Sequence, residues 1–167
     1  MNSKMKTYNF KKAVLAIIIV FVCLVCVYGQ AEDEYENAWA ICKPGNHINI
    51  RSRPSKKGEE EGWLEPGDMV YLDGKRKNGY VHCVELTTEA GEGWVHEGYL
   101  VYNPVEFVDS DYVVSSKGRL AARKNVNGKR AKWIKKDSIV HVYYWSEEWS
   151  YTEYGYIKSQ YLERQGE

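Results

Sequence analysis

Two cysteines, Cys42 and Cys83, are the residues with the most obvious potential for covalent chemistry. A cysteine nucleophile needs a thiolate, usually at a helix N-terminus with a base nearby. Cys83 instead follows Val81 at the two-residue spacing of one strand face, and Cys42 ends another short apolar segment. The pattern predicts two small buried hydrophobes, with a disulfide as the alternative if the chain reaches an oxidising compartment. We therefore predict no catalytic cysteine.

The histidines and carboxylates do not form a recognisable reactive set. His47, His82, His96 and His141 lie far apart and lack the spacing of metal ligands. Strand alternation predicts that all four are exposed between buried neighbours. The acidic run at 59–61 has the composition of a solvated loop. We accordingly predict no metal, no cofactor and no enzymatic activity.

The first 29 residues have the layout of an export signal. Four lysines without an acidic residue precede the apolar run 13–28, and a polar, acidic stretch follows it. The run has 16 residues, just short of the roughly 17–25 that a spanning helix needs. We predict a cleaved signal peptide, with an uncleaved membrane anchor as the alternative. In both cases the rest of the chain is predicted to be extracytoplasmic.

The formal net charge of +0 hides an uneven distribution. Four of the 23 basic residues and none of the 23 acidic residues lie in the leader, so the exported part carries a net charge of −4. Residues 40–103 contain 8 basic and 10 acidic groups, whereas residues 112–164 contain 11 basic and 5 acidic groups. This asymmetry predicts different partners for the two halves.

The basic excess is concentrated between residues 117 and 136, where no acidic residue occurs. A charge run is usually a solvated face, but this density also suits a phosphate-bearing polyanion, bound electrostatically and with strong salt dependence. The predicted polyanion-binding residues are Lys117, Arg119, Arg123, Lys124, Lys129, Arg130, Lys132, Lys135 and Lys136.

Aromatic residues with a polar group are frequent, with 14 tyrosines and 6 tryptophans. Trp63, Trp94, Trp133 and Tyr156 fit buried or hinge positions of a small β-domain. The other rings are too many for so small a core, so they either form a binding surface or are buried between two domains. These rings are Tyr80, Tyr99, Tyr143, Trp145, Trp149, Tyr151 and Tyr154.

An internal repeat predicts the architecture. Residues 93–100 match residues 155–162 at five positions, 62 residues apart, and residues 63–70 resemble residues 133–140. Echoes in the same order indicate a duplicated small domain.

Short strands separated by turn residues, with no 3.6-residue period after the leader, predict an all-β chain of two small β-barrels. The predicted parts are a signal peptide or anchor at 1–29, an acidic spacer at 30–38, a first barrel at 39–102, a linker at 103–111 and a second barrel at 112–164.

Four separated elements of the first unit resemble the bacterial SH3-like (SH3b) family. They are residues 49–54, 63–70, 78–83 and 93–100, so the match covers about residues 40–101. Tyr80 stands where the family has a hairpin tryptophan, and Cys83 replaces a core valine. The second unit resembles the family more distantly and keeps Arg123, Val140, Trp149, Gly155, Tyr161 and Leu162.

The resemblance implies tandem SH3-like barrels that act as an extracytoplasmic targeting module. Members of the family commonly bind cell-wall peptides or glycan. Tyr80, Trp94 and Tyr99 are the predicted ligand-binding residues, and Arg51 is expected to hold the barrel together.

We therefore predict an exported, non-catalytic binding module directed at the bacterial cell envelope. Its predicted partners are a cell-wall peptide or glycan and, at the basic stretch, teichoic acid or another polyanion. Nucleic acid is not favoured, and membrane contact is expected only through an uncleaved leader. The alternative is an extracellular protein–protein interaction or structural protein, whose tandem barrels bind a partner at an exposed sheet edge.

Overall fold

A computed structural model describes residues 35–86 and 91–165 of the chain. The predicted leader and the spacer up to residue 34 lie outside these residues. Within the described ranges, no helix has the length and apolar character needed to cross a membrane. The secondary structure of residues 35–86 and 91–165 consists of β-strands and two single-turn 3₁₀ helices, η1 (Glu97–Tyr99) and η2 (Ser159–Tyr161), which confirms the all-β prediction.

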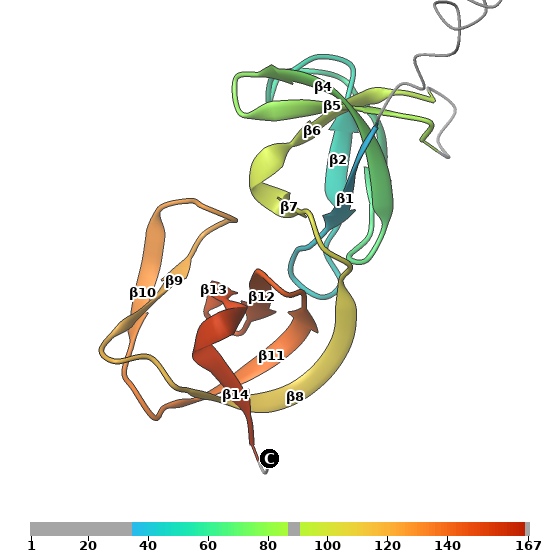
Figure 1. The fold of residues 1–167 in the computed structure, drawn as a ribbon. Coiled ribbons are helices and arrows are strands. Elements are labelled where there is room, and N and C mark those ends of the chain that lie inside the picture. The colour runs from blue at the N-terminus through green and yellow to red at the C-terminus, as the bar shows by residue number, and fades with distance from the viewer. Residues whose placement is uncertain (1–34, 87–90, 166–167) are drawn as a thin grey trace, which may run out of the picture. The chain divides into compact units, whose positions relative to one another are not determined.

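The first half of the described chain forms a seven-stranded sheet with the order β3-β2-β6-β5-β4-β1-β7 (Figure 1). Its strands are β1 (Glu36–Ala40), β2 (Ile48–Arg51), β3 (Glu60–Leu64), β4 (Met69–Lys77), β5 (Tyr80–Val84), β6 (Gly93–His96) and β7 (Leu100–Val101). Asn78 and Gly79 join β4 to β5 with positive φ angles of 54° and 77°, as a two-residue Asn-Gly hairpin requires.

The second half forms another seven-stranded sheet with the order β10-β9-β13-β12-β11-β8-β14 (Figure 1). Its strands are β8 (Glu106–Val114), β9 (Leu120–Arg123), β10 (Arg130–Ile134), β11 (Ile139–Trp145), β12 (Trp149–Thr152), β13 (Gly155–Lys158) and β14 (Leu162–Arg164). Each strand of the second sheet takes the place of its counterpart in the first, and η2 takes the place of η1. The same strand order in both sheets is what the internal repeat predicts.

Three expectations about the organisation differ from the structure. The segment expected to be a linker, residues 103–111, is mostly strand, because β8 starts at Glu106 and pairs with β11. Strand β1 starts at Glu36, inside the expected acidic spacer. The observed strand pairing also leaves β3 and β7, and β10 and β14, as sheet edges, so two open sheets are described and no closed barrel is found among these residues.

Each sheet has its own apolar core, formed by alternate residues of its strands. The first core includes Cys42 and Cys83, which are both buried and free, as predicted for small hydrophobes. The arginine that ends β2 or β9 closes the same loop in each repeat. Arg51 Nη1 donates to Gly58 O at 3.0 Å, and Arg123 Nη1 donates to Gly128 O at 2.8 Å.

A third apolar cluster joins the two sheets. Ile41 and Val101 from the first half pack with Trp149 and Tyr156 from the second, and all four are buried. The Tyr156 hydroxyl donates to Ile41 O at 2.7 Å. Burial between the two halves was one of the two interpretations of the surplus aromatic residues, and it holds for Trp149. Tyr156, expected at a buried or hinge position, is buried in the same cluster.

Three side chains have a burial that differs from the prediction. Trp63 and Trp133 are 62% and 46% exposed because β3 and β10 are edge strands. His82 was expected to be exposed but is only 8% exposed, because Asp73 on β4 supplies a hydrogen-bonding partner inside the sheet.

Candidate functional site

The described residues line a cleft of about 630 Å³ to which both sheets contribute side chains. On the first sheet's side it is bounded by residues that follow β1, by β2, and by η1 with its flanking residues. On the second sheet's side it is bounded by the β9–β10 loop and by β12 and β13. The cleft is within the 300–1,000 Å³ range that is usual for ligand sites.

A row of aromatic rings runs through this cleft from one sheet to the other. Its members are Tyr80, His96, Tyr99, Tyr156 and Tyr151. Each ring contacts the next, with centroid separations of 5.1, 5.4, 6.5 and 5.0 Å in that order. Rings with polar groups provide flat apolar area together with hydrogen-bonding atoms, which is the composition of surfaces that recognise ligands.

The charged residues of the cleft are all basic. They are Lys43, Arg51, Lys56 and Lys124, and no aspartate or glutamate is among the described residues that line it. Arg51 contacts Glu60, which lies outside the cleft lining, at 3.1 Å. Three asparagines, Asn46, Asn49 and Asn125, add uncharged hydrogen-bonding groups. The cleft is therefore suited to a ligand that has acceptor oxygens or negative charge.

Burial favours the uncharged forms of two cleft residues, His96 and Cys42. Burial, and secondarily the charge of Lys56, lowers the pKa of His96. His96 Nδ1 accepts from Gly98 N at 3.1 Å, so we assign the proton of the neutral ring to Nε2. Burial raises the pKa of Cys42 to about 11, which keeps it a thiol at neutral pH. A thiol is a poor nucleophile, so this cysteine lacks the activation that covalent catalysis needs.

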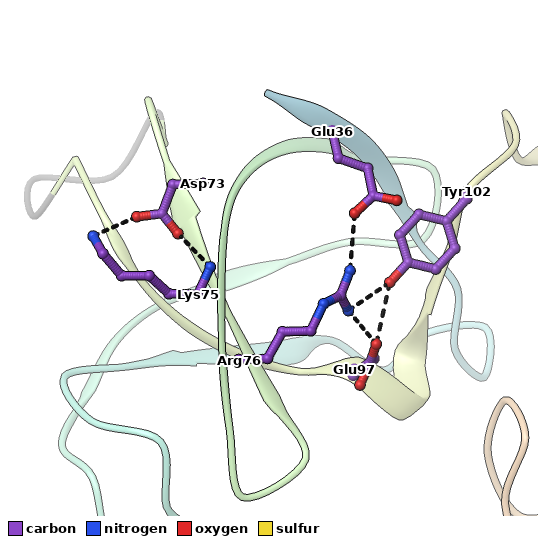
Figure 2. A network of polar contacts seen from close by, with 6 residues as sticks. All are labelled: Glu36, Asp73, Lys75, Arg76, Glu97 and Tyr102. Carbon is purple, nitrogen blue, oxygen red and sulfur yellow. Dashed lines mark hydrogen bonds and ion pairs between the residues drawn. The ribbon is translucent and has the colours of Figure 1, made fainter. Parts of the chain in front are cut away.

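Tyr99 is positioned by an exposed polar network that holds η1 on the sheet. Arg76 on β4 contacts Glu97 of η1, the Tyr102 hydroxyl at 3.0 Å and Glu36 of β1 at 2.9 Å (Figure 2). The backbone adds a further anchor, because Ile41 N donates to Tyr99 O at 2.9 Å.

The structure separates the three predicted ligand-binding residues. Tyr80 and Tyr99 line the cleft, and Tyr99 is partly exposed. Trp94 does not line it: its ring packs against His82, with centroids 4.9 Å apart.

The predicted basic stretch is also divided. Arg123 closes its own loop and Lys124 lines the cleft. The other seven are exposed: Lys117 and Arg119 lie in the β8–β9 loop, and the rest lie on β10 and on the loops at its two ends. They include Arg130, whose guanidinium lies 4.5 Å from the Trp133 ring centroid, and Lys132, whose ammonium lies 3.6 Å from that of Tyr154.

Several cleft residues were not among the predicted site residues. Lys43, Lys56, Tyr151 and Tyr156 come from four separate segments. Lys43 and Lys56 were not singled out in the sequence, and Tyr156 was expected at a buried or hinge position. The abundance of tyrosine was the one sequence signal for such a site. The segments that carry these residues come together only where the two sheets pack, and a local sequence pattern does not show that packing.

His82 belongs to a second polar group, at a bulge within β4. Asp73 Oδ2 accepts from Lys75 Nζ at 2.5 Å and lies 2.9 Å from His82 Nδ1 (Figure 2 shows the Asp73–Lys75 contacts). Burial alone would raise the pKa of Asp73, but the hydrogen bonds from Lys75 and His82 outweigh it and lower the pKa from 3.8 to about 2. The ionised carboxylate therefore stabilises the fold above about pH 4, and this contribution is lost as the pH falls toward 2.

We expect Asp73→Asn to lower the free energy of unfolding by about 1–2 kcal/mol at neutral pH and by much less near pH 2. Urea unfolding of both proteins across this range measures the difference. Lys75→Met, which removes one donor to the carboxylate, should reproduce part of the effect. A difference between Asp73→Asn and the parent that stays constant with pH would contradict the assignment.

Within the described ranges, no group of three or more histidine, cysteine, aspartate or glutamate residues is placed to hold a metal ion. Fold and site together define the chain as an all-β protein of two repeated seven-stranded sheets with an aromatic, basic cleft formed by both.

Comparison with known proteins adds resemblances to solved structures. No protein-family model and no curated protein matches the sequence. NlpC1 from Trichomonas vaginalis is 14% identical, with a TM-score of 0.35 over 81% of this chain and 48% of its own. NlpC2 from the same organism is also 14% identical, with a TM-score of 0.34 over 81% of this chain and 50% of its own. This chain thus spans about half the length of either protein, and resemblances this low indicate no function.

Proposed function

We propose that the chain is an exported, non-catalytic binding module of the cell envelope, built from two SH3b-like units. The observation that carries the proposal is the row of five rings across both sheets, in a cleft of about 630 Å³. The partly exposed rings of the row, His96, Tyr99 and Tyr151, offer flat faces on which sugar rings or peptide groups can lie. Asn46, Asn125 and the His96 Nε2–H are the hydrogen-bonding groups beside them. The ligand class is wall glycan or wall peptide, and export rests on the leader.

A co-sedimentation experiment with purified cell walls tests this function. We expect Tyr99→Ala to weaken binding at least about tenfold, because Tyr99 is the partly exposed ring at the middle of the row. Phe107→Ala is the control, since Phe107 is an exposed ring on β8 outside the cleft. The folded state of each variant is checked by near-ultraviolet circular dichroism. Wall binding that is absent in the parent protein, or equal in both variants, would overturn the proposal.

A second candidate function is binding of another protein at a sheet edge. The edge strands β3 and β10 expose Trp63 and Trp133 at equivalent positions of the two repeats. An edge strand with an exposed aromatic residue can accept an added strand from a partner. Binding that is lost in Trp63→Ala or Trp133→Ala but retained in Tyr99→Ala would favour this candidate.

A further inference from the structure

The basic residues of the cleft come from both repeats. Lys43 follows β1, Lys56 lies in the β2–β3 loop and Lys124 lies in the β9–β10 loop. The last two loops are equivalent in the repeated strand order, so each copy contributes one lysine from the same loop, although not from the same position in it. Among the described residues, none of these three lysines has an ion-pair partner, whereas Arg51 is paired with Glu60.

Uncompensated lysines that share one cleft produce a positive potential there, because low-dielectric walls concentrate the field. The lowered pKa of His96, to which the charge of Lys56 contributes after burial, is consistent with this potential. An anion is the ligand that such a site stabilises, since it forms charge-assisted hydrogen bonds with ammonium groups.

We propose, resting on the function proposed above, that the cleft binds an anionic saccharide polymer, whose phosphate or carboxylate is held between Lys56 and Lys124. The sugar lies along the partly exposed rings of the row, Tyr99 from the first repeat and Tyr151 from the second, and Asn125 beside Lys124 supplies an amide donor. The ligand therefore contacts both repeats at once. This places the specific anion site in the cleft and leaves the exposed lysines around β10 as a general electrostatic surface.

The test uses soluble probes and two double variants with the same net charge. The probes are phosphomannan, polygalacturonate and neutral dextran, and calorimetry measures the affinity of the chain for each. Lys56→Gln with Lys124→Gln removes the cleft charges. Lys117→Gln with Lys135→Gln removes two exposed charges outside the cleft and is the matched control.

We expect the cleft variant to lose at least about tenfold in affinity for an anionic polymer, and the control less than about threefold. The phosphate and carboxylate probes then show which anion the cleft prefers, and dextran should bind weakly to all three proteins. Equal losses in the two variants, no loss in the cleft variant, or no binding of either anionic polymer to the parent chain would overturn the anion site.

The outcomes also separate this inference from the envelope function. If Tyr99→Ala weakens wall binding while the cleft lysine variant binds walls and probes normally, the envelope function is supported and the anion site is rejected. If the parent chain does not bind cell walls but binds an anionic polymer through Lys56 and Lys124, the anion site is supported and the envelope function is rejected.

Discussion

Tyr156→Ala should destabilise the folded chain by about 3–5 kcal/mol, the usual cost of removing a buried aromatic ring. Tyr156 is 2% exposed, packs in the cluster that joins the sheets, and donates its hydroxyl proton to Ile41 O at 2.7 Å. Urea unfolding followed by tryptophan fluorescence measures the loss. Because each sheet has a core of its own, we also expect the variant to unfold in two transitions.

Two controls define what Tyr156 contributes. Tyr156→Phe keeps the ring and removes the hydroxyl, so it should cost only about 1 kcal/mol, plus any penalty for leaving Ile41 O unpaired. Phe107→Ala removes a ring that is 66% exposed and should have little effect. A loss below about 1 kcal/mol in Tyr156→Ala would show that the cluster does not couple the sheets.

Gly155→Ala is expected to cost about 3–4 kcal/mol, from two effects that add. Gly155 has a φ of +104°, which disfavours any residue with a Cβ. An added Cβ would also lie 2.4 Å from Arg123 O, a backbone atom of β9 that cannot move aside easily. The substitution should therefore disturb the pairing of β13 with β9, next to Tyr156.

Gly67→Ala is the matched control for this substitution. Gly67 has a similar φ of +98°, but an added Cβ there would meet no atom within 4 Å. Its cost should be about 1–2 kcal/mol, which is the conformational part alone. Thermal or urea unfolding of the two variants gives the difference, and equal costs would mean that the contact with Arg123 O is relieved by a small shift.

The sequence predicts the repeated architecture well because the repeat has local causes. Strands β6 and β13 each begin with a glycine, Gly93 and Gly155, at equivalent positions of the repeat. An added Cβ at either position would collide with the end of the neighbouring strand, β2 or β9, so both copies keep glycine there. The Asn-Gly pair at 78–79 similarly sets a two-residue hairpin. Such signals depend on neighbouring residues, so they can be read without knowing the tertiary structure.

The burial of individual side chains is harder to predict from alternation. Trp63 and Trp133 are large apolar side chains of the kind usually found in a core, but they are exposed because β3 and β10 are edge strands. His82 has a polar side chain but is buried, because a bulge in β4 brings Asp73 to it. Both outcomes depend on which strands become neighbours, which the local pattern does not contain.

The candidate site was predicted only in part for the same reason. Tyr80 and Tyr99 could be identified from the pattern of the first unit alone. Lys56 and Lys124 belong to one site only because the two sheets pack together, and their separation of 68 positions in the sequence gives no signal of this.

The burial of Tyr156 determines how many ligands one chain can hold. Tyr156 occupies in the second repeat the position of Trp94 in the first, but it is covered by residues of the first repeat. The duplication has therefore not produced two independent copies of one site. A chain of this kind should bind its ligand with a stoichiometry of one, and it gains no avidity from its two repeats. Firm attachment to a repetitive polymer would instead require several chains side by side.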